Sequence, residues 1–182
     1  MSKTVIGIDL GSTLSEVAII ENGKPIVVVN EEGSYTTPSV ISLKNGDRKV
    51  GASAKRQMIV NPKETVNLIK RFMGGKYNDE NIQKAIKYAS FDVVNKNGRP
   101  YVKINDREFS PEELSSYILT YMKQQAENYY GTEIKKAVIT CPAFYNDDQR
   151  QAVKLAGELA GLEVLRIMSV KGGVGKIIEY IG

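Results

Sequence analysis

Histidine and tryptophan are absent from this 182-residue sequence, and cysteine occurs once, at Cys141. Without histidine, no Ser-His or Cys-His nucleophile system can form. A lone cysteine gives neither an internal disulfide nor a zinc site. Its apolar neighbours favour a small buried strand residue over a reactive thiol. Any chemistry must therefore use carboxylates, lysine, hydroxyl groups and backbone amides.

Long apolar runs are also missing. No segment reaches the length needed to cross a membrane, and residues 1–4 are too short and polar for a signal peptide. The net charge is +4, but basic residues are spread along the chain without a block of about five or six. A nucleic-acid or phosphate partner is one interpretation of this charge, and a solvated basic surface is the favoured one. We expect a cytoplasmic protein with no membrane or nucleic-acid partner.

Apolar periodicity and turn signals predict an α/β protein with a smaller subdomain inserted into its sequence. Asn22-Gly23 predicts a hairpin turn between the second and third strands. Strands are expected over residues 5–9, 16–20, 25–29, 39–43, 91–94, 101–104, 137–140 and 164–168. Helices are expected over residues 52–60, 61–74, 81–88, 110–131 and 146–161.

Two of these helices carry clear signals. Ser110, Pro111 and Glu113 form an N-terminal capping pattern, and Gly131 marks the end. The expected apolar face of this helix contains Leu114, Tyr117, Ile118, Tyr121 and Met122. The inward positions expected in the helix over 146–161 are Ala152, Leu155, Ala156, Leu159 and Ala160.

An aspartate, a glycine and two hydroxyls follow the first predicted strand. Asp9 ends the strand, and Gly11, Ser12 and Thr13 form the next turn. Glycine lets the backbone approach an oxyanion, while successive amides and hydroxyls can cradle a phosphate. Asp9 would then face a phosphate-bound magnesium ion, through water. A Gly-Ser hairpin turn with a surface aspartate explains the same residues equally well.

Two further positions stand out, and the first of them has both a functional and a structural interpretation. Lys70 stands near the end of the helix expected over 61–74, where a lysine could reach a phosphate or orient an attacking water. A lysine that complements the helix dipole is the more frequent case. Pro142 fixes a turn where the strand over 137–140 leaves the sheet.

The order of several motifs resembles the DnaK-type heat-shock chaperones, the 70 kDa heat-shock family, over about residues 3–168. The segments Ile6-Gly7-Ile8-Asp9-Leu10-Gly11 and Ile69-Lys70-Arg71-Phe72-Met73-Gly74 are both typical of that family. Further similar segments are residues 35–40, 50–51, 54–57, 137–140, 142–143, 149–152 and 160–167. Each motif is weak alone, but their common order and spacing are specific.

The resemblance implies lobe I of an actin-like (ribonuclease H-like) ATPase, which binds ATP or ADP with Mg²⁺. Residues 1–38 and 113–182 would form its base subdomain, and residues 39–112 the inserted upper α+β subdomain. It also implies roles for particular residues. The catalytic residues would be Asp9, Thr13 and Lys70. Of these, Asp9 would face the metal through water. The nucleotide would be bound by Gly11, Ser12, Thr13 and Lys70, while Pro142, Arg150 and Arg166 would serve interdomain and J-domain contacts.

Several departures from the family pattern lead us to expect little activity in this chain alone. The second lobe and the peptide-binding domain are not encoded in the 182 residues, and Leu14 replaces a polar or aromatic residue. The expected catalytic glutamate falls on Val170 or on Gly172. The order Phe144-Tyr145 inverts the family's usual aromatic pair, which we interpret as minor.

The last segment also has an alternative interpretation. The run Lys171-Gly172-Gly173-Val174-Gly175-Lys176 resembles the phosphate loop of ParA and MinD-type ATPases. It lacks the first glycine and the hydroxyl after the lysine, where Val170 and Ile177 stand. We therefore expect a glycine-rich end rather than a phosphate loop.

Three functions remain at this point. The favoured one is a truncated or diverged chaperone nucleotide-binding lobe with weak or absent nucleotide affinity. The others are a non-catalytic scaffold module of the same fold and, least favoured, a phosphate-loop ATPase. Self-association is expected, and contacts with a J-domain co-chaperone or nucleotide exchange factor follow only from the resemblance.

Overall fold

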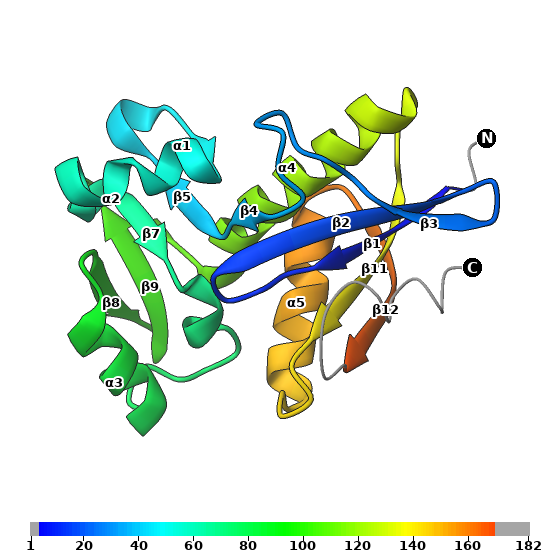
Figure 1. The fold of residues 1–182 in the computed structure, drawn as a ribbon. Helices are drawn as coiled ribbons and strands as arrows, with labels where there is room; N and C mark the ends of the chain where they lie inside the picture. The colour runs from blue at the N-terminus through cyan, green and yellow to red at the C-terminus, as the bar shows by residue number, and fades with distance from the viewer. Residues whose placement is uncertain (1–3, 170–182) are drawn as a thin grey trace.

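The computed structural model describes residues 4–169, which form a mixed α/β fold (Figure 1). Its main sheet has six strands in the order β12-β11-β1-β2-β3, with β4 also paired to β2. The strands are β1 (Val5–Asp9), β2 (Leu14–Glu21), β3 (Lys24–Val27), β4 (Thr37–Pro38), β11 (Lys136–Cys141) and β12 (Glu163–Ser169). β11 runs parallel to β1 and β12, whereas β1, β2 and β3 are antiparallel neighbours. The predicted Asn22-Gly23 turn is confirmed, with φ angles of 51° and 74°.

Two helices, α4 (Pro111–Tyr130) and α5 (Asp147–Leu159), pack on one face of this sheet. The Oγ of Ser110 accepts a hydrogen bond from the backbone N of Glu113 at 3.0 Å, and Gly131 ends α4 in the left-handed region. Alternate residues of the strands, Ile6 and Ile8 among them, share a core with both helices. A strand exposes successive side chains on opposite faces. Asp9 therefore points to the face opposite α4 and α5.

Residues 40–109 contain two smaller antiparallel sheets and several short helices. One sheet has the order β6-β5-β7, with β5 (Val40–Ser42), β6 (Lys49–Val50) and β7 (Thr65–Asn67). The other has the order β10-β9-β8, with β8 (Asp92–Lys96), β9 (Arg99–Ile104) and β10 (Arg107–Phe109). The helices are α1 (Ala52–Lys55), α2 (Gln57–Val60) and α3 (Glu80–Tyr88), with 3-10 turns at Lys44–Gly46, Pro62–Glu64 and Ile69–Phe72.

The prediction of a helix over residues 61–74 is wrong. The chain makes a 3-10 turn, the strand β7 and a second 3-10 turn instead. Leu68 adopts a left-handed conformation with φ 55°, which interrupts any helix at that point. β7 pairs with β5, so sheet pairing outweighed the helical spacing of the apolar residues. Lys70 consequently lies in a short buried turn rather than near the end of a helix.

The predicted inner face of α5 is partly wrong. Ala152, Ala156 and Ala160 are buried, but Leu155 and Leu159 are 46% and 54% exposed. Small residues face the sheet because the helix approaches it closely. A Cβ on Gly157 would lie only 2.4 Å from Cγ2 of Val164. The two leucines therefore project from the outer side of α5, whereas the sequence analysis expected them to point inward.

Candidate functional site

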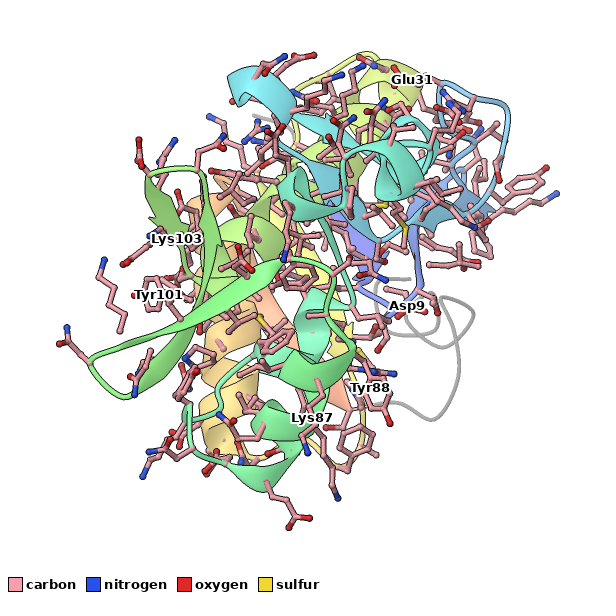
Figure 2. The ribbon with its side chains drawn as sticks, turned by 90° about the vertical axis from the view of Figure 1, so that its left-hand side faces the viewer. Asp9, Glu31, Lys87, Tyr88, Tyr101 and Lys103 are labelled. Atoms are coloured by element: carbon pink, nitrogen blue, oxygen red, sulfur yellow. The ribbon has the colours of Figure 1, made fainter. Side chains whose placement is uncertain are left out.

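The end of β1 carries an oriented carboxylate. Asp9, which Figure 2 labels, lies directly opposite Thr140 on the parallel strand β11 and opposite Glu16 on β2. The hydroxyl of Thr140 donates a hydrogen bond to Oδ1 of Asp9 at 2.8 Å. Partial burial, and secondarily the charge of Asp9, raise the pKa of Glu16. The sheet register thus places two carboxylates side by side and fixes one of them with a hydroxyl.

The loop after Asp9 is held in place by Ser39, and the hydroxyl groups of the loop are exposed. Ser39 donates its hydroxyl to the backbone O of Gly11 at 2.9 Å, and its backbone N to the O of Thr13 at 2.8 Å. A Cβ at Gly11 would lie 1.9 Å from the backbone O of Leu14, so the turn requires glycine. Ser12 and Thr13 are exposed. Exposed hydroxyls and backbone amides within one tight turn suit the binding of a phosphate.

Lys70 is a buried cation that points at this loop. Its residue surface is only 6% exposed, and Nζ donates a hydrogen bond to the backbone O of Leu10. Burial lowers the pKa of Lys70, while the negative charge of Asp9 acts in the opposite direction. The hydroxyl of Tyr145 donates to the backbone O of Lys70 at 3.2 Å, and Nζ lies 5.5 Å from the centre of the Tyr145 ring. An ammonium has three donors, so Lys70 can also serve an anion.

A pocket of about 340 Å³ brings several of these residues together with α3. The lining includes three residues that the sequence analysis assigned to a site, namely Ser12, Lys70 and Pro142. It also includes Arg71, Lys84 and Tyr145. Three of the lining side chains are cationic and none is acidic, although Lys84 also pairs with Glu80 of the same helix at 2.8 Å. This combination suits a polyanion such as the phosphate chain of a nucleotide.

A model of the Hsp70 protein family matches residues 5–171. The chain belongs to the Hsp70 family. The mixed α/β arrangement agrees with the actin-like ATPase fold of Hsp70 proteins, so the predicted fold class is confirmed. Hsp70 proteins are chaperone ATPases that bind ATP with Mg²⁺ and generally work with J-domain proteins and exchange factors.

The residues predicted to serve interdomain contacts in this Hsp70-family chain are not all together. Pro142 lines the pocket, and its backbone O accepts from the N of Tyr145 at 3.1 Å. Arg150 donates to the backbone O of Ile167 at 3.1 Å and also to the hydroxyl of Ser169, which ties α5 to the end of β12. Arg166 lies on β12 opposite Val138 and does not line the pocket. The phosphate-loop interpretation fell on residues 171–176, which lie outside the described residues.

Sequence reasoning missed several contributors to the candidate site. Thr140 was assigned only to a buried strand, although its polar side chain at the strand end was a signal. The inverted Phe144-Tyr145 pair was interpreted as minor, yet Tyr145 is the buried member that contacts Lys70. Lys84 of α3 lies 14 positions after Lys70 and shares no motif with it.

The candidate cation ligand is a single carboxylate. Residues 4–169 contain no group of three or more His, Cys, Asp or Glu side chains placed to hold a metal ion. Magnesium commonly keeps several waters and uses one or two carboxylates with substrate phosphates. Asp9 beside a phosphate cradle fits that mode. None of the helices described over residues 4–169 is long and apolar enough to cross a membrane.

Proposed function

We propose that this Hsp70-family chain supplies the phosphate- and magnesium-facing half of a nucleotide site, and does not hydrolyse ATP usefully by itself. The observation that carries the proposal is the pocket lined by Ser12, Lys70, Arg71 and Lys84, which has no acidic residue in its lining. Pockets of about 300–1,000 Å³ are the usual size for small ligands. At about 340 Å³ this one suits part of a nucleotide rather than a whole one.

Each residue would act through the group it presents. Asp9 would orient the water shell of the cation, because Thr140 already fixes its carboxylate. Ser12, Thr13 and the loop amides would donate to phosphate oxygens, and Gly11 would permit the tight turn that presents them. Lys70 would donate to the terminal phosphate or orient the attacking water. A bound Mg²⁺ would supply charge neutralisation at the phosphates.

The expectation of low activity depends on what surrounds these groups. In the family that the sequence resembles, the adenosine pocket and a catalytic glutamate come from segments that have no counterpart in the 182 residues. Losing the base pocket removes most of the apolar part of nucleotide binding. Positions 170 and 172, where the glutamate was expected, lie outside the described residues. The domain division at residues 38 and 113 and a cytoplasmic location also stay predictions.

Calorimetric titration with ATP and Mg²⁺ tests the proposal. We expect a dissociation constant weaker than about 10 μM, or roughly −7 kcal/mol, and a further loss in the Lys70→Ala variant. Lys63→Ala is the matched control, since Lys63 is exposed and pairs with Asp92 away from the pocket. Tight binding, or hydrolysis that Lys70→Ala abolishes, would contradict the proposal of weak affinity and inactivity.

A non-catalytic scaffold module is the second candidate. It would keep the fold and a partner surface, and Leu14 favours it because this residue adds no polar group to the phosphate loop. Complete absence of a nucleotide signal up to about 1 mM, in a chain that is folded, would select this function. Binding to a J-domain protein through Pro142, Arg150 and Arg166, or to an exchange factor, would then be tested by itself.

We also propose that the chain self-associates. Leu155 and Leu159 expose apolar surface on α5, and exposed apolar patches often mark interfaces. A closed dimer is the commonest symmetric assembly. Light scattering over a concentration series should show a mass above that of the 20.1 kDa chain. A constant monomer mass at high concentration would exclude the dimer.

A further inference from the structure

A second pocket lies between the β9–β10 turn and α4, and it shares no lining residue with the pocket that Ser12 and Lys70 line. Its volume is about 630 Å³, well within the range of small-ligand sites. Leu43, Ile104 and Phe109 line it, and each is at most 8% exposed because it also belongs to the core. The pocket therefore has a fixed apolar wall.

One guanidinium in this pocket has no acidic partner. The Cζ atom of Arg48 lies 4.2 Å from the centre of the Tyr117 ring. Arg48 is exposed, and none of the ion pairs among residues 4–169 includes it. A guanidinium stacked on an aromatic face keeps its N–H edges free to bind a carboxylate in two places. Arg48 is thus an ordered cation that lacks an anion.

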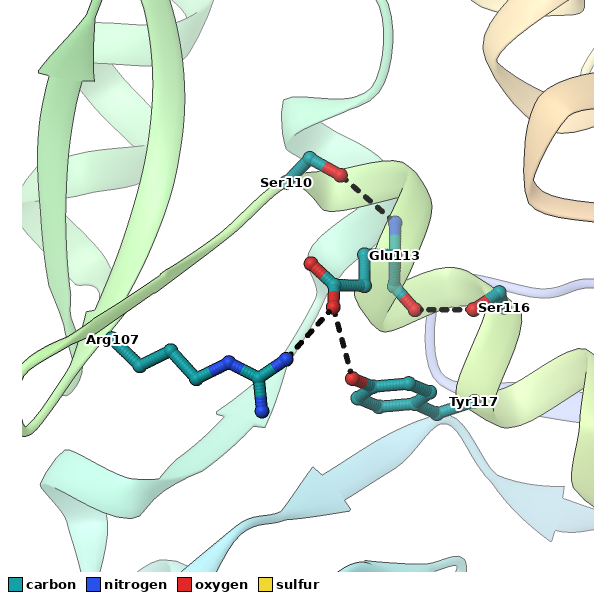
Figure 3. Close-up of polar contacts among 5 residues, drawn as sticks. All are labelled: Arg107, Ser110, Glu113, Ser116 and Tyr117. Carbon is teal, nitrogen blue, oxygen red and sulfur yellow. Dashed lines mark hydrogen bonds and ion pairs between the residues drawn. The ribbon is translucent and has the colours of Figure 1, made fainter. Parts of the chain in front are cut away.

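A second guanidinium, that of Arg107, lies over a different ring of the lining, Phe109. Arg107 Cζ lies 4.7 Å from the centre of the Phe109 ring, and Nη2 lies 3.5 Å from Oε1 of Glu113. The same oxygen accepts a hydrogen bond from the Tyr117 hydroxyl at 3.2 Å (Figure 3). Burial, followed by the charge of Glu113, raises the pKa of Tyr117, so its hydroxyl stays a donor at neutral pH. Glu113 is therefore already shared, and its contact with Arg107 is long.

Glu113 is itself held in place by the start of α4. Its backbone N donates to Oγ of Ser110 at 3.0 Å, and its backbone O accepts from Oγ of Ser116 at 2.5 Å (Figure 3). These contacts fix the backbone of Glu113, and its carboxylate is engaged by Tyr117 and Arg107. Asp106 is the acidic member of the lining, and no ion pair joins it to either arginine. Arg107 is paired with Glu113, so Arg48 is the lining arginine that has no ion-pair partner among residues 4–169.

We propose that this pocket binds a small amphipathic carboxylate, with its charged group on Arg48 and Arg107 and its apolar body against Leu43, Ile104 and Phe109. A single negative charge matches the lining, and the apolar wall favours an organic acid over inorganic phosphate. The proposal is independent of the nucleotide site, because the two sets of lining residues do not overlap.

The probe is 2-naphthoate, titrated into the isotope-labelled 182-residue chain and followed through backbone amide NMR signals. We expect saturable shifts at Asn105, Arg107 and Tyr117, with a dissociation constant below about 1 mM. The neutral 2-naphthamide keeps the body without the charge, and acetate keeps the charge without the body. Both should bind at least about tenfold more weakly. Equal binding of the amide, or the absence of saturable shifts at these residues, would overturn the proposal.

Arginine variants separate this site from nonspecific attraction. Arg48→Gln should weaken 2-naphthoate by about tenfold or more, as expected for a hydrogen bond to a charged group. Arg56→Gln is the control, because Arg56 is exposed and does not line the pocket. If Arg48→Gln disturbs the spectrum of the free chain, Arg107→Gln gives the same test at a side chain that is 71% exposed. Unchanged affinity in the pocket variant, or shifts at Ser12 and Lys70 instead, would sink the proposal.

Discussion

Thr140 and Asp9 stand opposite each other on neighbouring parallel strands, and the threonine hydroxyl donates to the aspartate carboxylate at 2.8 Å. Both side chains point away from α4 and α5, so the contact is not part of the main core. Carboxylates that face a cation are commonly oriented by an outer hydrogen bond. The pair therefore connects the register of the sheet to the orientation of the proposed magnesium-facing group.

Thr140→Val should weaken the binding of Mg²⁺-ATP by several-fold, because Asp9 loses its orienting donor. It should also lower the free energy of unfolding by about 1 kcal/mol. Thr65→Val is a matched control. Thr65 is 1% exposed and donates to the backbone O of Asn61 at 2.8 Å, away from the pocket. Calorimetry and urea unfolding of both variants should show a similar loss of stability but a loss of affinity in Thr140→Val alone.

Tyr145→Phe should reduce the free energy of unfolding by about 1 kcal/mol, because it removes the hydrogen bond to the backbone O of Lys70. Phe144 is its neighbour in sequence but is 81% exposed, so Phe144→Leu should change stability by less than about 0.5 kcal/mol. Urea midpoints measured on the two variants check the difference. Equal effects would mean that the inverted aromatic pair has no structural consequence.

Much of the fold was predictable where local signals and tertiary packing agree. The capping residues of α4, the Asn22-Gly23 turn and the apolar strand β11 are all where the sequence places them. Segment 61–74 failed because its apolar spacing fits a helix, while its partner β5 is distant in sequence. A propensity argument contains no information about such a partner.

The candidate site was predictable only in part. Asp9, Gly11 and Lys70 came from motifs, and the structure adds the contacts that hold them. Thr140 could have been found from the pairing of β1 with β11, but that register is not contained in either segment alone. Burial of Lys70 was also missed, because an amphipathic helix was expected there and it would have left the lysine exposed.

Gly74→Ala should destabilise the fold by about 3 kcal/mol, which combines overpacking with a left-handed backbone. Gly74 has φ 66°, and an added Cβ would lie 2.7 Å from Cα and N of Gln149 in α5. Gly98→Ala is the control, since Gly98 has φ 85° but nothing lies within 4 Å of the added atom. It should cost only about 1 kcal/mol. Thermal unfolding of both variants separates backbone conformation from the close approach of α5 to the turn that carries Lys70.

Lys70→Met should stabilise the chain by about 1 kcal/mol at pH 7, because it removes a buried cation and keeps a side chain of similar length. Burial lowers the pKa of Lys70 from its ordinary value of 10.5. Between the folded-state pKa and 10.5, the unfolded state therefore binds more protons, and the free energy of unfolding of the wild type rises with pH. The advantage of Lys70→Met should shrink over that window. The same variant should lose nucleotide affinity, since the phosphate-facing ammonium is gone.

Lys63→Met is the control for this last comparison. Lys63 pairs with Asp92 at 2.9 Å, but both side chains are more than half exposed. Exposed ion pairs contribute little, so its free energy of unfolding should stay within about 0.5 kcal/mol of the wild type at every pH tested. Urea unfolding at several pH values measures both variants. If Lys70→Met proves destabilising while Lys63→Met is neutral, the hydrogen bond from Lys70 to the backbone O of Leu10 outweighs the cost of burying the cation, and the expected stabilisation is wrong.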